Sequence, residues 1–372
     1  MTEPIDKARA SRRRFLAGAA GLAAAGATGA RADNVKNLPP NIADWTRSLG
    51  DGVGVRAYGH PSKYEKDTIR RTVSWLTATP ESSVSFTPLH ALDGIITPSG
   101  LCFERHHSGI AEIDPNDYRL ILHGMVHCLQ YTGVPLKLLL DQAGVKANAK
   151  WLMAEGGDAA AMNRSIPLAK ALDDCIVAYR MNGEMLRPEQ GYPVRLVVPG
   201  WEGNVWIKWL RRLKVGDQPW YTREETAKYT DLLEDGKARK FTFEMDAKSV
   251  ITSPSPQAPL KQKGFTVLSG LAWSGRGKVK RVDVSLDGGR NWRNARIDGP
   301  VFDKACVRFY TEFDWNGEEL LLQSRAMDDS GYVQPSKEAL RKIRGVNSIY
   351  HNNGIQTWAL KSDGEVENVE VG

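Results

Sequence analysis

The chain changes its hydrophobic pattern near residue 250. Before that point, apolar residues recur at helical spacing over 136–143 and stop at Gly144, so a helix is expected there. A second helix is expected over 166–172, with Ser165 as its N-cap. Short apolar runs such as 176–179 favour strands between the helices. This part of the chain is therefore predicted to be a mixed α/β domain.

Beyond residue 250 the pattern becomes one of short alternating strands. Before this change, the stretch 222–240 is charged and helix-prone. The Ser-Pro-Ser-Pro run at 253–256 is expected to form an extended link between the two parts. Strands of the length and spacing that follow are typical of an immunoglobulin-like β-sandwich. They are expected at 265–268, 279–286, 305–310 and 320–326.

The length of 372 residues suits two domains rather than a single core. The predicted fold class is α+β, with a mixed α/β domain followed by an immunoglobulin-like β-sandwich. The expected divisions are a leader over 1–32, an irregular arm over 33–80, the mixed domain over 81–240, the sandwich over 250–350 and a tail over 351–372.

An export signal occupies the N-terminus. Residues 11–16 read SRRRFL, a twin-arginine pattern, 17–29 form a weakly apolar stretch, and 30–32 form an A-x-A cleavage site. The apolar stretch is too short and too rich in glycine to span a bilayer. Because twin-arginine export carries folded proteins, often with a cofactor already inserted, the sequence predicts a periplasmic cofactor enzyme without a membrane span.

The charge balance excludes one class of partner. The formal net charge is +6, but residues 1–32 hold six basic and two acidic side chains. The remaining 44 basic and 42 acidic residues leave a net charge of +2. Such a balanced mature chain gives no basis for nucleic-acid binding.

Two basic residues lie in runs that are apolar enough to be buried. Arg195 lies inside 194–198, and Lys208 lies inside the aromatic-basic run 206–213. Because burying a lone charge is costly, each needs a partner, which can be an ion pair in the core or an anionic ligand. Arginine suits a phosphate or an oxyanion, since its planar guanidinium is permanently charged.

Two further polar islands occur in turn-rich contexts. One reads FERHH at 103–107, and the other reads EGGD at 155–158 and is followed by RSIP at 164–167. Taken singly, each can be a solvated loop, a turn or a structural ion pair. Taken together with Arg195 and Lys208, they suit a large anionic cofactor.

The cysteines show no close metal-binding spacing. Buried thiols that act as small apolar residues are the default interpretation. A periplasmic location would permit disulfides, but the sequence alone does not pair them. The four are Cys102, Cys128, Cys175 and Cys306.

The run GYPVRLVVPG at 191–200 resembles the pterin-binding run of the sulfite oxidase family of molybdopterin oxidoreductases. The similarity covers about residues 85–350. Within the family, the ERHH loop and the run WEGN at 201–204 are most similar to the SoxC-type sulfane dehydrogenase subunits of thiosulfate-oxidising bacteria. Other motifs occur in the family's order, namely FERHH at 103–107, SIPL at 165–168, YRMNGE at 179–184 and VDVSLDGG at 282–289.

This resemblance implies a sulfite-oxidase-like molybdopterin domain followed by an immunoglobulin-like dimerisation domain that forms a homodimer. It also implies a molybdenum–molybdopterin cofactor, oxygen-atom transfer from water to a sulfur compound that can be protein-bound, and electron transfer to a c-type cytochrome. Arg105 and Arg195 are the expected catalytic residues, and Gln190 stands where sulfite oxidases have a histidine. The expected cofactor-binding residues are Phe103, Arg105, His106, His107, Asp158, Gln190, Arg195, Trp206, Ile207 and Lys208.

One element of the family pattern is missing. The family binds molybdenum through a Cys thiolate in a segment between a strand like 118–123 and the run TGVPL, here 132–136. In this chain those two parts are nearly fused, so no metal ligand is assigned. Cys128 as a substitute ligand, or a zinc or copper site of Cys128 with His123 and His127, is a weaker alternative than a buried structural thiol.

Two other functions stay open. A chain without the Cys segment can be a non-catalytic or inactivated partner subunit that keeps the sandwich and a cytochrome-binding face. The second is a periplasmic sulfoxide reductase of the same superfamily, although such reductases generally lack the C-terminal sandwich.

Overall fold

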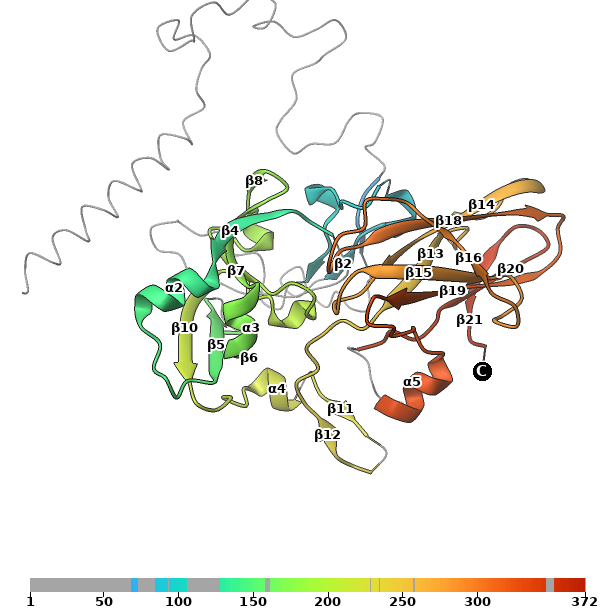
Figure 1. The fold of residues 1–372 in the computed structure, drawn as a ribbon. Coiled ribbons are helices and arrows are strands. Elements are labelled where there is room, and N and C mark those ends of the chain that lie inside the picture. The colour runs from blue at the N-terminus through green and yellow to red at the C-terminus, as the bar shows by residue number, and fades with distance from the viewer. Residues whose placement is uncertain are drawn as a thin grey trace, which may run out of the picture. The chain divides into compact units, whose positions relative to one another are not determined.

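β-Strands make up most of the regular structure of this chain (Figure 1). The expected export leader, most of the predicted arm and the strand expected at 118–122 lie outside the residues that can be described. Within the described ranges, no helix is long and apolar enough to cross a membrane. The computed structural model describes residues 68–72, 84–92, 94–105, 128–157, 161–227, 229–233, 235–256, 258–345 and 351–371.

The described part before residue 245 contains small antiparallel sheets. One sheet joins β1 (Arg71–Thr72), β2 (Val84–Phe86) and β3 (Glu104–Arg105). A second joins β10 (Leu210–Gly216), β5 (Trp151–Gly156) and β6 (Asn163–Pro167). A third contains β4 (Tyr131–Pro135), β7 (Ile176–Met181), β8 (Glu184–Met185) and β9 (Arg195–Val197), and β11 (Asp231–Leu232) pairs with β12 (Ala238–Arg239).

Helix α2 (Leu136–Ala143) confirms the first predicted helix. It buries Leu136 and Leu140 on one face, and Gly144 ends it with φ of 74°. Helix α3 (Leu168–Asp173) begins later than predicted, and the assignment of Ser165 as its N-cap is wrong. Ser165 lies in β6, where its hydroxyl donates to Glu225 Oε2 at 3.0 Å and accepts from Trp220 N at 3.0 Å instead of from a helix amide.

The charged stretch 222–240 is helical over fewer residues than predicted. Helix α4 spans Arg223–Ala227, after which the chain forms the β11–β12 hairpin. Buried Asp231 in that hairpin pairs with Arg344 of helix α5 (Lys337–Arg344), with Nη1 and Oδ2 3.0 Å apart. This tertiary ion pair favours the hairpin over the local helix propensity.

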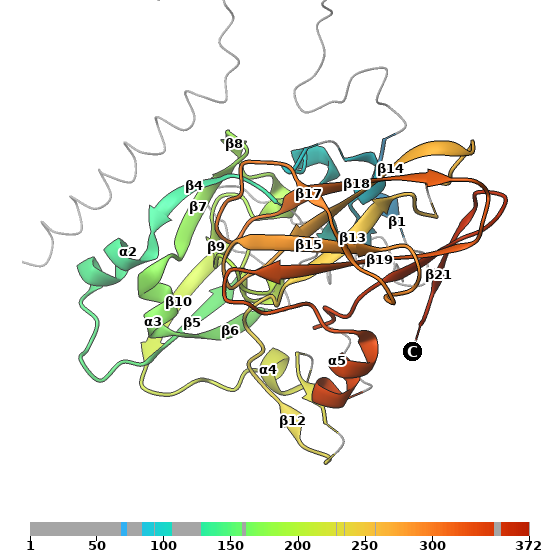
Figure 2. The ribbon, with the colours of Figure 1, turned by 45° about the vertical axis from the view of Figure 1, so that its right-hand side comes forward.

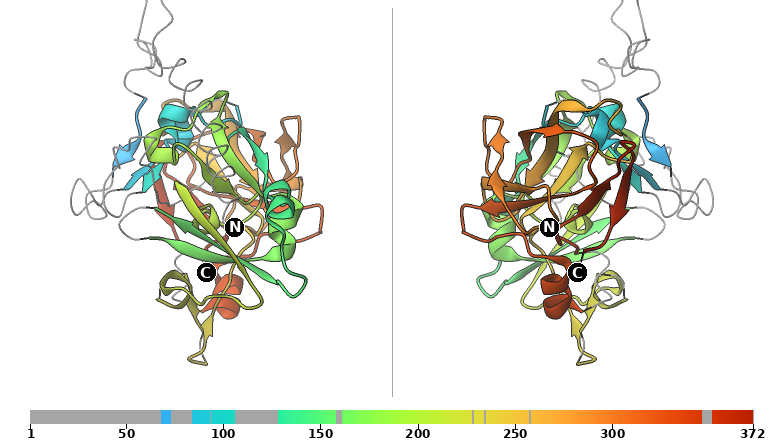
Figure 3. Two further views of the ribbon diagram at one scale, coloured as in Figure 1. Left: turned by 90° about the vertical axis from the view of Figure 1, so that its left-hand side faces the viewer. Right: turned by 90° about the vertical axis from the view of Figure 1, so that its right-hand side faces the viewer.

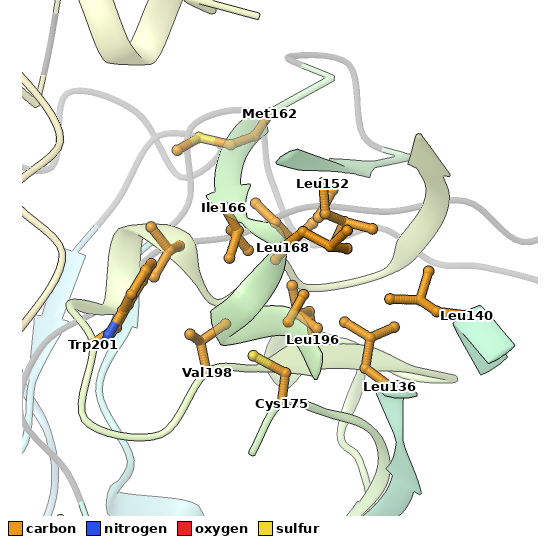
Figure 4. Close-up of a cluster of buried hydrophobic side chains, with 14 of the residues drawn as sticks. Leu136, Leu140, Leu152, Met162, Ile166, Leu168, Cys175, Leu196, Val198 and Trp201 are labelled. Atoms are coloured by element: carbon orange, nitrogen blue, oxygen red, sulfur yellow. The ribbon is translucent and has the colours of Figure 1, made fainter. Parts of the chain in front are cut away.

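Side chains from the second and third sheets share one hydrophobic core with α2 and α3. Figure 4 shows Leu136, Leu152, Ile166 and Leu196 in this cluster, and none of the four is exposed to solvent. Because side chains alternate along a strand, Leu196 of β9 faces this core while its neighbour Arg195 projects from the other face. The core therefore fixes the strand that presents Arg195.

The C-terminal part consists of two sheets around a second core, as the strand pattern predicted (Figures 2 and 3). Val282, Phe309 and Leu322 are fully buried in it. One sheet contains β13 (Lys248–Ser253), β14 (Gly264–Trp273), β18 (Val307–Trp315) and β17 (Arg296–Ile297). The other contains β16 (Arg293–Asn294), β15 (Val279–Ser285), β19 (Leu320–Asp328), β20 (Thr357–Leu360) and β21 (Val366–Val369).

The residues expected to form a tail, 351–372, contain β20 and β21. Strand β20 pairs with β19, with Thr357 opposite Gln323, and β21 pairs with β20. Pairing satisfies the otherwise open edge of β19, which is the physical reason for this departure from a tail. Sheet order cannot be deduced from the weak alternation of two four-residue strands.

A buried carboxylate–histidine network joins the sandwich to the chain before it. His351 Nδ1 lies 2.5 Å from Glu202 Oε1, and His351 Nε2 lies 2.9 Å from Asp246 Oδ2. Burial lowers the pKa of His351, but the hydrogen bonds to the two carboxylates outweigh it and raise that pKa above its usual value. Burial raises the pKa of Asp246, but hydrogen bonds from His351 and Arg276 outweigh that effect and lower the pKa to about 2. The network is therefore strongest with His351 protonated.

We expect the free energy of unfolding to decrease as pH rises from 6 to 9. Since the folded pKa of His351 is raised, its stabilisation is complete below the unfolded pKa of about 6.5 and is lost as pH rises through the folded pKa. His351→Gln should lower stability at pH 6 by about 3 kcal/mol, because it removes the cation between two buried carboxylates. Urea unfolding across this pH range measures both effects.

His90→Gln is the matched control. His90 is exposed in the 3-10 turn Leu89–Ala91, and partial burial lowers its pKa, so its own contribution has the opposite sign. That variant should keep the loss of stability at high pH. An equal loss in His351→Gln would contradict the assignment to His351.

Candidate cofactor site

The hairpin of β7 and β8 holds a distant segment in place. Asn182 and Gly183 join the two strands with φ of 50° and 79°, as the predicted tight Asn-Gly turn requires. Asn182 Nδ2 donates to Thr97 O at 3.0 Å, and Asn182 Oδ1 accepts from Gln130 N at 2.9 Å. The segment 94–105, which carries the start of the FERHH loop, is thereby fixed beside the start of β4.

Arg195 is buried, as the sequence predicted, with 4% of its surface exposed. Its Nη1 donates to Gln190 O at 3.2 Å and its Nη2 donates to Trp206 O at 3.4 Å. Its Cζ lies 5.5 Å from the ring centre of Tyr131 and 5.8 Å from that of Trp206. Its buried Nε has no hydrogen-bond partner, and no carboxylate pairs with it, among the described residues. This guanidinium keeps donor capacity and positive charge for a further group.

Lys208 is brought to the same turn by a glycine. Lys208 is 2% exposed, and its Nζ donates to Glu189 O at 2.6 Å. Gly191 follows the 3-10 turn Pro188–Gln190 with φ of 108°, and a Cβ there would lie 3.0 Å from Lys208 Cβ and 3.2 Å from Arg195 Cβ. A side chain at this position would strain the backbone and push the two cations apart. The side-chain stems of Arg195 and Lys208 therefore lie against the same turn.

Phe103 and Gln190 connect the FERHH loop to this turn. Gln190 Nε2 donates to Phe103 O at 3.2 Å, and Phe103 N donates to Thr87 Oγ1 at 3.1 Å. Both Phe103 and Gln190 are buried. Residues far apart in the chain are thus joined at one site by a side-chain amide.

Trp206 and Ile207 have different surroundings. Trp206 Nε1 donates to Trp201 O at 2.9 Å, and its ring meets that of Tyr131 edge-on, with centres 5.8 Å apart. Ile207 is fully buried in the first core, and its carbonyl accepts from Leu196 N at 2.7 Å. Any direct contact of Ile207 with a ligand would have to use its backbone.

Of the remaining predicted site residues, the structure describes only the backbone of one. The backbone of Arg105 lies in β3, paired with Val84 of β2, whereas His106, His107 and Asp158 lie outside the described residues. In the second polar island, the carboxylate of Glu155 pairs with Arg211 and Arg212 on β10, with Arg211 Nε 2.7 Å from Oε1. That glutamate serves a structural ion pair, which was the simpler interpretation.

Two residues at the site were not predicted from the sequence. Tyr131 contributes its ring to Arg195, and burial raises the pKa of Tyr131 to about 12 against the opposing charge of Arg195. Burial likewise raises the pKa of the Cys102 thiol to about 11, although Arg195, Lys208 and Arg70 oppose that rise. Both groups are therefore neutral near pH 7. Only their adjacency to the FERHH and TGVPL motifs signalled them.

The comparisons with known proteins agree with this arrangement. A family model described as the oxidoreductase molybdopterin binding domain matches residues 105–223, and one described as the Mo-co oxidoreductase dimerisation domain matches 239–358. The crystal structure of the sulfane dehydrogenase SoxCD from Paracoccus pantotrophus contains a chain that is 50% identical. It superposes with a TM-score of 0.82 over 91% of this chain and 98% of that chain.

Sulfite oxidases of vertebrates are also similar. The sulfite oxidase of Gallus gallus is 31% identical over an alignment 330 positions long. This alignment covers 68% of this chain and 71% of that protein. Mitochondrial sulfite oxidase of Mus musculus is 28% identical over 371 residues, covering 79% of this chain and 67% of that protein. With the buried cations, the two family domains and these relatives in agreement, the chain belongs to the sulfite oxidase family of molybdopterin oxidoreductases.

Proposed function

We propose that this chain is a periplasmic, molybdenum-dependent dehydrogenase of sulfane or sulfite sulfur that passes electrons to a c-type cytochrome. The observation that carries the proposal is the pair of buried cations, Arg195 and Lys208, packed around Gly191. The likeness to the SoxCD chain supports the sulfane substrate class. The twin-arginine pattern at 11–16 supports the periplasm.

The side chains of the site fit the anionic part of molybdopterin. A phosphate needs several hydrogen-bond donors and compensating charge, and Arg195 offers a buried Nε that no described residue uses. The glycine at 191 lets the backbone of the turn approach closely, and the neutral states of Tyr131 and Cys102 leave the local charge positive. The site thus suits a ligand of negative charge.

Each residue would contribute in a defined way. Lys208 and Arg195 would neutralise the pterin phosphate, while Phe103, Gln190 and Trp206 would hold the ring system; Arg105, His106, His107 and Asp158 remain predicted contacts. When bound, the cofactor supplies oxygen-atom transfer and two-electron redox chemistry to the sulfur substrate. The rings of Tyr131 and Trp206 keep water from the Arg195 guanidinium, and in the lower local dielectric its charge would orient an oxyanion more strongly than in water.

The metal's own ligand is the weak part of this fit. The family's Cys segment is not found in the sequence, and no group of three or more His, Cys, Asp or Glu suited to a metal occurs in the described ranges. This favours a second candidate function, a partner subunit that keeps the fold and the cytochrome-binding face without a working metal. Dimerisation through the C-terminal domain is expected for both candidates, since the dimerisation model matches 239–358.

Metal and pterin content decide between the two functions. The dehydrogenase should purify natively with about one molybdenum and one pterin per chain, and it should reduce cytochrome c when given a sulfane substrate or sulfite. Pterin without molybdenum, and no cytochrome reduction, would support the partner subunit. The absence of both pterin and molybdenum would refute the cofactor assignment.

Removing the buried ammonium should reduce pterin retention. Lys208→Met preserves the length of the side chain but removes the charge and the bond to Glu189 O, so we expect at least about tenfold less pterin per chain. Lys214→Met is the matched control, because Lys214 is exposed on β10, over Trp220. Fluorescence of the oxidised pterin after denaturation measures both. Equal losses in the two variants would count against a phosphate site at Lys208.

Tyr131→Leu tests the aromatic support of Arg195. Loss of a ring beside a desolvated guanidinium costs about 1–2 kcal/mol, so pterin should dissociate about tenfold faster, whereas Tyr131→Phe keeps the ring and should dissociate at nearly the wild-type rate. Tyr310→Leu removes a comparable ring, 5.4 Å from the Arg296 guanidinium, in the sandwich and should leave the rate unchanged. Stopped-flow pterin fluorescence follows the release.

A further inference from the structure

Two cysteines from distant parts of the chain meet at the boundary between the two family domains. Cys128 lies within the molybdopterin-binding match, just before β4, and Cys306 lies within the dimerisation match, just before β18. They are 178 positions apart in sequence. Both are free thiols, and they are hydrogen-bonded to one another.

The surroundings of the pair are apolar and well packed. Cys306 is 6% exposed and clusters with Leu271 and Trp273, while Cys128 is half-buried and packs against the same group together with Leu89. The reagent-accessible sulfur is therefore that of Cys128, and the protected one is that of Cys306.

Backbone contacts hold both cysteines close to each other. Cys128 O accepts from Thr97 N at 2.9 Å. Arg308 lies two residues after Cys306 and contacts the chain just before Thr97. Its Nη2 donates to Leu92 O at 2.9 Å and to Gly94 O at 2.8 Å. Leu92, Gly94 and Thr97 thus contact the chain beside both cysteines. The two sulfurs are thus held within hydrogen-bond distance of one another.

The two thiols also differ in reactivity. The hydrogen bond from Cys306 lowers the pKa of Cys128, and the same bond together with burial raises the pKa of Cys306. The other cysteines are less reactive, since burial raises the pKa of Cys102 to about 11 and that of Cys175 to about 12. Thiolate character and partial exposure make Cys128 the attacking group.

We propose that Cys128 and Cys306 form a structural disulfide that joins the molybdopterin-binding domain to the dimerisation domain. The oxidant is a protein or small-molecule disulfide of the kind present in an oxidising compartment. The Cys128 thiolate attacks one sulfur of that disulfide and expels its other sulfur as a thiolate. The Cys306 sulfur then attacks Cys128 and expels the second thiolate. The cysteines lose two electrons and two protons, and the oxidant becomes two thiols.

This bond would stabilise the approach to the cofactor site. Residues 94–97, which Cys128 and Arg308 hold by hydrogen bonds, lie shortly before Cys102 and Phe103 in the chain. Closing a loop of this length removes much conformational freedom from the unfolded chain, so the stabilisation should be large. The inference does not depend on the proposed dehydrogenase activity, but it rests on the proposed periplasmic location, which supplies the oxidant.

Peptide mapping of the full-length chain tests the pairing directly, because trypsin places each cysteine in a different peptide. The protein is equilibrated with oxidised glutathione, alkylated and digested without reduction. We expect residues 120–137 to be cross-linked to residues 305–308, and dithiothreitol to release both peptides. Full alkylation of all four cysteines, or a cross-link that involves Cys102 or Cys175, would overturn the proposal.

A thermal comparison tests the structural consequence. The melting temperature of the oxidised wild-type chain should exceed that of the reduced chain by at least about 5 °C. Cys128→Ser and Cys306→Ser should each lose this difference, whereas Cys175→Ser, which changes a thiol bonded to Lys170 O, should keep it. Since each variant is compared with itself under two redox conditions, packing losses cancel. A difference that persists in Cys128→Ser would exclude this pair as its source.

Discussion

The compensation of two buried cations constrains the whole turn between β8 and β10. The Arg195 guanidinium donates to backbone carbonyls and lies beside aromatic rings, but it pairs with no described carboxylate. The Lys208 ammonium donates to a carbonyl of the same turn. Carbonyl dipoles offset only part of the cost of desolvating a charge. The turn can therefore keep its conformation only where Gly191 leaves room for both stems, and where Gln190 ties the turn to Phe103. The cost of this local arrangement is offset by the apolar core beneath it.

Elements specified by local physics were predictable from the sequence. Helix α2 follows from spacing and a glycine stop, and the sandwich strands follow from alternation. The predictions of local structure were wrong where a distant residue formed a bond that favours another conformation. Glu225 bonds Ser165, which lies in a strand instead of capping the helix, and Arg344 pairs with Asp231, which lies in a hairpin instead of a helix. In each case a charged group that lies far away in sequence decided a local conformation.

The candidate site divides in the same way. Arg195 and Lys208 were predictable, because a charge within an apolar run needs compensation wherever the chain places it. Tyr131 and Cys102 were not, because their roles depend on three-dimensional neighbours that no spacing encodes. The likeness to the SoxCD chain is also compatible with the absence of the family's Cys segment. The turn that carries Arg195 and Lys208 is supported by Leu196 and Ile207 in the first core and does not need that segment.

The histidine bridge between Glu202 and Asp246 has a consequence for the order of assembly. His351 lies 149 positions after Glu202 in the sequence, yet it supports the loop that leads into Trp206 and Lys208. A nascent chain lacks that support until residue 351 has been synthesised and has left the ribosome. The cofactor site can consequently mature only after residue 351 has been synthesised, and a chain that ends before residue 351 would lack a support of a site more than 140 residues upstream.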